Sequence, residues 1–525
     1  MTATTQPVRT YDVIVFGDEV PGIMAIVAAA REFNRRTGRR LRALLMFKGN
    51  SQAGVGGHLV RGGLAYLDRS SIPLDVRQSV GLATFGDPSS LYKEFLQRSG
   101  VIQIALDPRK ADAALRKMLS EAGVDILSRV QIESVQKQGN RITGIKLTRG
   151  ETYLAKQFID ATVNAELAQA AGVRKLQGFG TLGLPDSELP VTLVFETEGL
   201  SIQRLKEVEL SYIRRLTNPH DSEAQRYIAI AASSNQALAD FLRKDCVDAQ
   251  GKLKTMVVGR DHIDIRCRAL SIFYHAFRGK KLSLAESGMI LDQANIACLP
   301  GGRLSWNALL CYTTGAQAEA LARAGAKPTA AMVEEVTFIE RWLKSVGATR
   351  VKPMLELYIR HAGNVIDAVE PLSGARMLEG GVLANEAIAT FGYHLDVRGG
   401  ITGLGARANE RGIDSITFHT PPLFNVGIRH ALMRSVPNLA VVSPASGFDG
   451  YACAAGRIVE FNVAVGQGVG IAAAIALNSN RNLADIPNRE VRQVLVQTGQ
   501  LPKIYGRANM LEASRLQAFE STMIA

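Results

Sequence analysis

The chain has 525 residues, of which 46% are hydrophobic and 21% charged, and its formal net charge is +12. This length exceeds one ordinary core, and this composition excludes a disordered, fibrous or membrane-embedded chain, so we expect two large globular units. The positive charge suits an anionic cofactor or substrate, whereas no recognition motif or aromatic platform accompanies it, so we expect no nucleic-acid partner.

Localisation and thiol chemistry follow from three absences in the sequence. The most apolar stretches, residues 13–30 and 461–477, contain polar residues and predict no integral membrane span. The first residues show neither an apolar signal region nor an Arg-rich transit pattern, so we expect a cytoplasmic protein. The five cysteines form no CxxC pair and no set with metal-ligand spacing, which predicts free thiols and no metal site.

The N-terminal residues predict the opening of a nucleotide-binding domain. Residues 11–16 form an apolar run that ends in Gly17, and residues 21–35 follow as a helix with small residues on one face. A second apolar run, residues 41–47, fits the next strand. This order of strand, tight turn, helix and strand predicts the βαβ unit of a doubly wound parallel sheet.

The turn between the first strand and the helix departs from the usual glycine fingerprint. Gly17 suits the sharp turn and Gly22 suits close packing of the helix, but Glu19 stands where the middle glycine is expected. The helix N-terminus offers N–H donors to a diphosphate. Asp18 and Glu19 would repel that diphosphate unless their carboxylates point away.

Two further features follow this βαβ unit. At the end of the second strand, Phe47 and Lys48 replace the acidic residue that ordinarily binds a ribose, and Lys48 is either a phosphate ligand or a solvated lysine. The next segment, residues 54–64, is rich in glycine. Such a segment indicates either a close approach of the backbone to a ligand or a tight turn without one.

Four segments together resemble the FAD-dependent oxidoreductase family of the xanthan-lyase-associated type, within the FAD/NAD(P)-binding Rossmann superfamily. They are residues 11–31, 56–68, 158–172 and 436–474. Val163 occupies a usual glycine position of the family, and Ser443 and Pro444 replace its Gly-Arg pair. In the last segment the resemblance implies a helix that opens at Gly466 and points its N-terminus at the pyrimidine side of the flavin, favouring a reduced anionic ring.

The resemblance implies a Rossmann-like FAD-binding domain with a parallel sheet and a three-stranded crossover insert, and FAD as a non-covalent cofactor. The insert fits the helix at 110–122 and the short strands at 124–127, 130–136 and 141–147. The residues that we expect to contact FAD, from the glycine turns and the resemblance together, are Gly17, Glu19, Gly22, Lys48, Gly56, Gly57, His58, Gly62, Gly63, Val130, Asp160, Thr162, Arg457, Gly466, Gln467, Gly468 and Gly470.

The middle of the chain predicts an α+β substrate or cap domain. We expect strands over 191–196, 256–258 and 264–270, and helices over 316–324 and 330–346. We expect the FAD-binding domain in two parts, a first part over 8–175 and a C-terminal part over 415–485. The substrate domain is expected between them, over 176–414, and a helical tail over 486–525.

Candidate catalytic residues come from two stretches of this middle region that resemble family motifs, residues 357–361 and 391–396. Arg360 is suited to bind a carboxylate or phosphate, or alternatively to form an ordinary interdomain ion pair. The candidates for proton transfer are Tyr358, His361, Tyr393, His394 and His419. His58 follows Gly57 in the loop expected beside the flavin, where it would tune N5 or bond to the ring.

We therefore expect an FAD-dependent oxidoreductase that transfers a hydride between an organic small molecule and the flavin N5. One alternative is a non-catalytic or regulatory relative with weak or lost FAD binding. The departures that point to it are Asp18, Glu19, Phe47, Val163 and Ser443-Pro444. Another is a lyase or isomerase that uses flavin without net redox change. The expected partner is a small-molecule substrate, and a homodimer remains open.

Overall fold

The apolar run after residue 12 forms the central strand of a parallel sheet. In the computed structural model, which describes residues 8–524, every residue of this strand, β2 (Val13–Phe16), is buried. The sheet has the order β20-β8-β2-β3-β4, and all four neighbouring pairs are parallel. Its other strands are β3 (Ala43–Phe47), β4 (Asp125–Ser128), β8 (Gln157–Asp160) and β20 (Leu439–Val441).

The order of these strands is that of a Rossmann-type domain. Numbered along the chain, the five strands lie as 3-2-1-4-5, the doubly wound order, in which the strand order reverses beside the first strand. The predicted mixed α/β fold with a parallel sheet is confirmed. Ligands of such sheets bind outside the carboxyl ends of the strands at that reversal, which here lies between β2 and β8.

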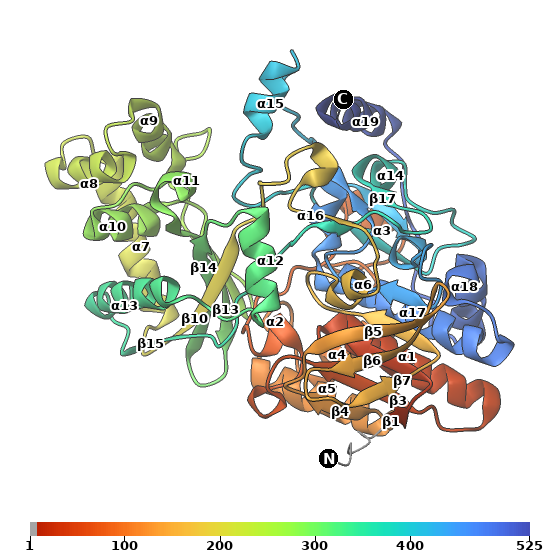
Figure 1. The fold of residues 1–525 in the computed structure, drawn as a ribbon. Coiled ribbons are helices and arrows are strands. Elements are labelled where there is room, and N and C mark those ends of the chain that lie inside the picture. The colour runs from red at the N-terminus through yellow and green to blue at the C-terminus, as the bar shows by residue number, and fades with distance from the viewer. Residues whose placement is uncertain (1–7, 525) are drawn as a thin grey trace.

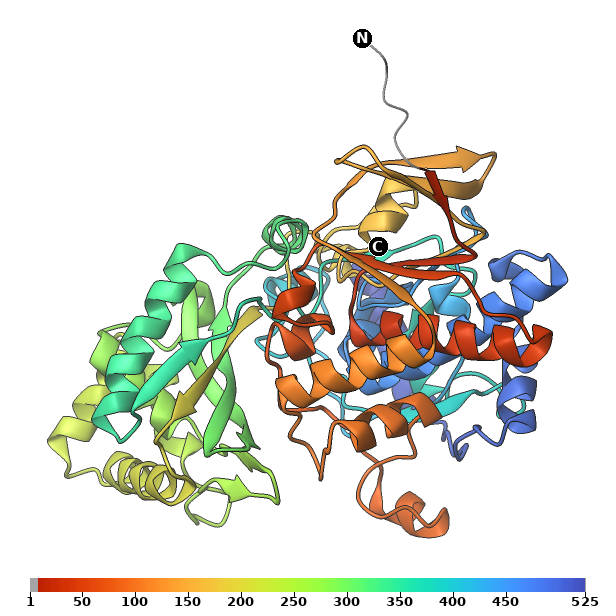
Figure 2. The same cartoon turned by 90° about the horizontal axis from the view of Figure 1, so that it is seen from below.

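Two long helices cover one face of this sheet and pack tightly on each other (Figures 1 and 2). They are α1 (Val20–Thr37) and α17 (Val459–Ser479). A side chain on Gly466 would clash with the carbonyl of Pro21, and one on Gly470 with the carbonyl of Ala25. These glycines therefore allow the two helix backbones to approach closely. By length and composition α17 would also suffice to cross a membrane, but its apolar window is entirely buried, as in a core helix.

The expected start of the last helix at Gly466 is wrong. The helix begins at Val459, so Gly466, Gln467, Gly468 and Gly470 lie in its interior. Gly468 faces Ile388 and Ile428, and Gln467 donates to Ser90 Oγ at 2.7 Å and accepts from the Leu91 N–H at 3.1 Å. The glycines were expected at the opening of a helix, but here they lie inside it and serve close packing.

A small antiparallel meander covers the opposite face of the parallel sheet (Figure 1). Between β4 and β8 the chain forms β5 (Ile132–Gln138), β6 (Arg141–Leu147) and β7 (Thr152–Leu154), which β1 (Val8–Thr10) extends in the order β1-β7-β6-β5. Ile142 and Ile145 pack with Ile14 and Phe16 of β2. The preceding helix, α5 (Pro108–Glu121), lies where a helix was predicted.

The second unit is built on a six-stranded sheet with its own core (Figures 1 and 2). Its order is β11-β12-β13-β14-β10-β15 and every pairing is antiparallel. The strands are β10 (Val191–Glu198), β11 (Val257–Val258), β12 (His262–Asp264), β13 (Met289–Leu299), β14 (Arg303–Cys311) and β15 (Arg350–Pro353). The helices of this unit and its border are α7 (Ile202–Thr217), α8 (Ser222–Ala232), α9 (Gln236–Asp245), α10 (Ala269–Arg278), α12 (Gly315–Arg323) and α13 (Ala330–Ser345).

Two expectations for this region need correction. The strand expected over 264–270 is wrong, because β12 ends at Asp264 and α10 begins at Ala269. The core of the unit ends at Ala362, whereas Ile388 and Phe391 pack into the core of the parallel-sheet unit. The expected boundary at residue 414 therefore lies later than the end of this core. The tail forms α18 (Asn488–Gln497) and α19 (Met510–Ile524).

Candidate functional site

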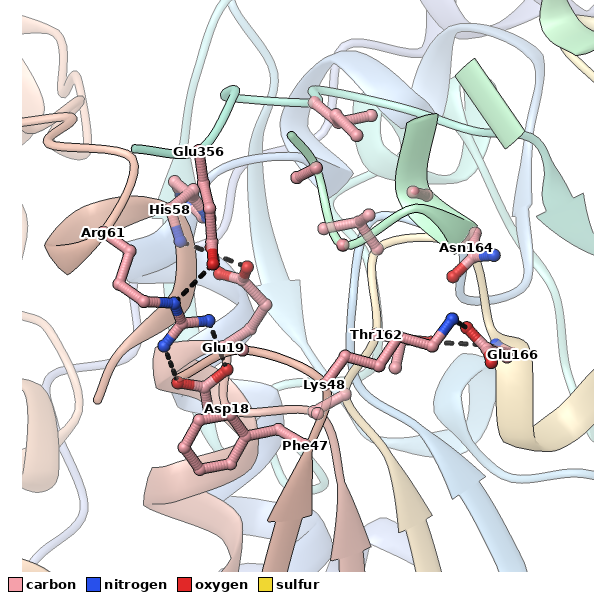
Figure 3. A pocket seen from close by; sticks show the side chains of 18 of the residues that line it. Asp18, Glu19, Phe47, Lys48, His58, Arg61, Thr162, Asn164, Glu166 and Glu356 are labelled. Carbon is pink, nitrogen blue, oxygen red and sulfur yellow. Dashed lines mark hydrogen bonds and ion pairs between the residues drawn. The ribbon is translucent and has the colours of Figure 1, made fainter. Parts of the chain in front are cut away.

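A pocket lies at the carboxyl ends of β2, β3 and β8, where α1 begins (Figure 3). We call it the strand-end pocket. Gly17, Asp18 and Glu19 line it from β2 and α1, and residues 47–49 and 161–166 line it from the ends of β3 and β8. The glycine-rich segment after β3 adds His58 and Arg61, and the second unit closes the pocket with Ala322, Gly325, Ala326, Glu356, Leu357 and Ile359. This is the place where a doubly wound sheet binds its ligand.

Arg61 binds two acidic side chains across this pocket (Figure 3). Its guanidinium donates to Asp18 Oδ1 at 2.9 Å and to Glu356 Oε1 at 2.6 Å. Asp18 is buried and also accepts the Gly56 N–H at 3.0 Å. Burial raises the pKa of Glu356 to about 7, although Arg61 opposes this shift. The carboxylate of Asp18 thus turns away from the N-terminus of α1 toward the glycine-rich loop.

Beside the contacts of Arg61, Glu19 forms a pair with His58 (Figure 3). Its carboxylate contacts His58 Nδ1 and accepts the His58 backbone N–H at 3.2 Å. A carboxylate at Nδ1 assigns the ring proton to that nitrogen and leaves Nε2 as an acceptor. Nε2 is buried and has no partner among the described residues, and the ring stacks on Tyr358 with centroids 4.9 Å apart.

The glycines expected to contact a ligand lie close to other parts of the chain. Gly17 has φ +101°, and a Cβ at this position would lie only 2.6 Å from the backbone of Ala161. Gly22 packs against the side chain of the same alanine. The glycines of the loop pack inside the chain as well: Gly56 against Leu115 and Val60, Gly57 against Glu19, Gly62 against His58 and Gly63 against Met354. In this structure the glycine content serves tight packing around the acidic pairs.

Lys48 forms an ion pair instead of standing free at the strand end (Figure 3). Its ammonium lies 2.5 Å from Glu166 Oε2 and donates to the carbonyl of Arg323 at 2.8 Å. Asp160 is buried behind this edge, where it accepts from Thr162 Oγ1 at 2.7 Å and from the Ala168 N–H at 2.9 Å. Burial raises the pKa of Asp160 to about 6. Asp160 therefore fixes the turn into α6 (Glu166–Ala170), and Thr162 lines the pocket.

A larger basic cavity adjoins the strand-end pocket. It holds about 810 Å³, compared with about 80 Å³ in the pocket itself, which the ion pairs fill. Val130, one of the residues expected to contact FAD, lines this cavity. Its charged lining residues are Lys48, Arg61, Arg129, Arg323, Lys327 and Glu356. The cavity is therefore lined by the apolar residue Val130 and by more basic than acidic side chains.

A second group of side chains lies beyond His58, and we call it the arginine–tyrosine cluster: Asp68, Tyr358, Arg360, Tyr393 and Arg457. The Arg360 guanidinium lies 4.5 Å from the Tyr358 ring centroid, and that of Arg457 lies 5.7 Å from the Tyr393 ring centroid. Burial lowers the pKa of Arg360 to about 9 and raises the pKa of Tyr393 above its usual value. The cluster joins the end of the second unit to Arg457, two residues before α17 begins.

The remaining catalytic candidates lie apart from this cluster. His361 is buried with both ring nitrogens engaged, at 2.7 Å from Glu188 and 2.6 Å from Asn364. Burial lowers the pKa of His361, but Glu188 raises it more, so that it lies above its ordinary value. Asn364 in turn donates to the carbonyls of Pro444 and Ser446. His361 therefore connects two loops, whereas His394 and His419 are exposed.

Sequence reasoning missed three charged residues of these sites. Arg61 lies within the glycine-rich loop, and its role follows once Asp18 is seen to need a counter-charge. Glu356 lies 295 residues from Arg61, and no local pattern indicates their contact. Asp68 ends the segment 56–68, and no motif marks it either.

Comparisons with known proteins give one family. A family model described as FAD dependent oxidoreductase matches residues 12–495. No curated protein matches the chain. Among solved structures, L-proline dehydrogenase from P. horikoshii is 11% identical with a TM-score of 0.33, covering 94% of this chain and 100% of that one. PqsL from P. aeruginosa in complex with 2-aminobenzoylacetate is 11% identical with a TM-score of 0.36, covering 98% and 100%. Likenesses at this level carry no argument about the substrate.

Proposed function

Because the chain belongs to the FAD dependent oxidoreductase family, we propose that this FAD-dependent enzyme transfers a hydride between an organic small molecule and the flavin N5. The observation that carries the proposal is the Glu19–His58 pair, whose free Nε2 lies beside Tyr358. The narrower likeness to xanthan-lyase-associated members stays a prediction.

The residues of the strand-end pocket fit FAD on one condition, that the carboxylates of Asp18 and Glu19 keep their partners within the chain. Arg61 and Lys48 offset the charges of Asp18 and Glu166, and His58 donates hydrogen bonds to Glu19. The N-terminus of α1 would hold the diphosphate, and the basic cavity would hold the adenosine. Because the pocket is narrow, we propose that Lys48 exchanges Glu166 for a phosphate oxygen when FAD binds.

When bound, FAD supplies a two-electron acceptor that takes a hydride. As the substrate C–H bond breaks and a C=O or C=N bond forms, the substrate must also lose a proton from its oxygen or nitrogen. His58 Nε2 is the acceptor for that proton, and Glu19 stabilises the imidazolium that results. Tyr358 fixes the plane of the ring by stacking on it.

The proposal is tested by mixing the FAD-containing protein without oxygen with a panel of alcohols, amines, acids and polyenes. We expect at least one class to bleach the flavin absorbance, and the bleaching to be strongly slowed in His58→Asn. If no member of a broad panel reduces the flavin, the hydride-transfer proposal fails, and the non-catalytic relative is favoured instead.

A further inference from the structure

Two guanidinium groups of the arginine–tyrosine cluster are buried with little negative charge around them. Arg360 is 1% exposed and Arg457 is 5% exposed. Arg360 donates to the Pro190 carbonyl at 2.8 Å and to Asn307 Oδ1 at 3.3 Å, both uncharged. No ion pair joins Arg360 to a carboxylate anywhere in residues 8–524, and Arg457 reaches only Asp68, at 3.9 Å.

Other buried arginines of the molecule are paired much more closely. Arg61 lies 2.6 Å from Glu356 in addition to its pair with Asp18, and Arg303 lies 2.9 Å from Glu196 and 2.8 Å from Asp107. A buried ion without a partner costs several kcal/mol. Arg360 thus carries a desolvation cost that ion pairs offset at Arg61 and Arg303. This contrast indicates that a bound ligand supplies the counter-charge at Arg360.

Both arginines have an N–H group that is free to donate a hydrogen bond to such a ligand. The Nε atoms of Arg360 and Arg457 are buried, and within the part of the chain that the structure describes neither has a hydrogen-bond partner. The cluster also reaches the surface, because the side chain of Asp68 is 29% exposed and Tyr393 is only half-buried. On its inner side, Tyr358 stacks on His58 of the strand-end pocket.

We infer that Arg360 and Arg457 bind the carboxylate group of the substrate, so that the enzyme acts on organic carboxylic acids. The inference rests on the proposed function for the chemistry, but the binding site itself does not depend on it. Two guanidiniums and one Asp68 carboxylate leave a surplus of one positive charge, which matches a monoanion better than a phosphate dianion. The planar fork of arginine matches a carboxylate with two hydrogen bonds.

The experiment titrates oxidised, FAD-containing protein with propionate, butyrate and benzoate, and with the matching neutral amides. We expect a saturable shift of the visible flavin spectrum and a rise of the melting temperature with the carboxylates, and neither with the amides. Arg360→Met should weaken carboxylate binding about 10–100-fold, as expected for the loss of hydrogen bonds to a charged group. The control Arg350→Met removes an exposed arginine and should leave binding unchanged.

Three results would overturn the inference. One is no carboxylate-dependent change in either readout with wild-type protein, and another is tighter binding of inorganic phosphate than of the carboxylates. The third is a change of flavin reduction potential in Arg360→Met without carboxylate binding in the wild type, because the pair would then serve the reduced cofactor alone. If Arg360→Met fails to fold, Arg457→Lys is titrated instead, with weaker binding as the expected result.

Carboxylate binding and hydride transfer can fail separately. Carboxylate binding without bleaching by any member of the panel would leave the carboxylate site intact and contradict the proposed function. Bleaching by a neutral substrate, with no effect of carboxylates, would do the reverse.

Discussion

The strand-end pocket and the arginine–tyrosine cluster treat buried charge in opposite ways. In the pocket, Arg61 is shared by two carboxylates, and the acidic side chains of Glu19 and Glu166 each contact a basic group. In the cluster, Arg360 and Arg457 are equally buried, but Arg457 reaches one carboxylate, at 3.9 Å, and Arg360 pairs with none among residues 8–524. The difference teaches that burial does not by itself identify a ligand site. Removing one partner of a balanced pair leaves a buried charge and destabilises the fold, whereas a surplus charge lowers the stability of the ligand-free protein.

The largest expected effect is on the rate of flavin reduction, and it tests whether the strand-end pocket supplies the proton acceptor. His58→Asn should lower the rate of flavin reduction by about 10²–10⁴-fold, because the proton acceptor is lost, while FAD content stays unchanged. Glu19→Gln should give a smaller loss. The rate is measured by rapid mixing with a reducing substrate from the panel, and exposed His394→Asn is the control. An unchanged rate in His58→Asn would remove the acid–base role from the pocket.

The next effect tests whether the pocket is stabilised by its own ion pairs. Arg61→Met leaves Asp18 and Glu356 buried without their partner, so the free energy of unfolding should fall by about 3–5 kcal/mol. Denaturant unfolding at pH 7.5 measures it. Adding Asp18→Asn and Glu356→Gln to the variant should restore part of the loss, because the unpaired charges are then removed. A loss below about 1 kcal/mol would show that the pairs contribute little.

The same measurement on the cluster should give a much smaller change. Arg360→Met loses hydrogen bonds to Pro190 and Asn307, but it also removes a buried cation without an ion-pair partner. These contributions offset each other, so we expect the free energy of unfolding of the ligand-free protein to change by about 1 kcal/mol or less. If Arg360→Met destabilises as strongly as Arg61→Met, Arg360 is structural and the contrast between the two regions disappears.

The smallest effect is a pH dependence of FAD binding. Glu356 has a pKa raised to about 7, by burial first and also by Asp18 and Glu19, with Arg61 opposing. The diphosphate adds negative charge and raises this pKa further, so binding takes up a proton and affinity rises as pH falls. We expect the Kd to fall by up to about tenfold from pH 8 to 6, measured by flavin fluorescence. Glu356→Gln should flatten this dependence, and an affinity that rises with pH would contradict it.

Local patterns predicted the parts of the fold that depend on neighbouring residues. The strand–turn–helix at Gly17, the strand after it, and β5 and β6 lie where the apolar runs indicate. The strand expected in the insert over 124–127 is instead β4 of the parallel sheet, and β7 was not predicted. The hairpin of β13 and β14 was missed, although Gly301 and Gly302 mark its turn.

The candidate site was harder to predict because its contacts join distant residues. Glu19 was recognised as an obstacle to a diphosphate, but its hydrogen bonds to His58, 39 residues later, are a product of folding. The same holds for Arg457, which lies 99 residues from Tyr358 in sequence and 3.5 Å from its hydroxyl in space. The sequence therefore names the groups, and the fold decides which are paired.

The most direct test of this account is the visible absorption spectrum of the freshly purified protein, with the flavin released by denaturation and identified by chromatography. The account predicts about one FAD per chain, released without a covalent link, because the carboxylates of the strand-end pocket are paired within the chain. A colourless protein that cannot be reconstituted with FAD would contradict it, since the paired carboxylates would then fill the site instead of permitting the cofactor.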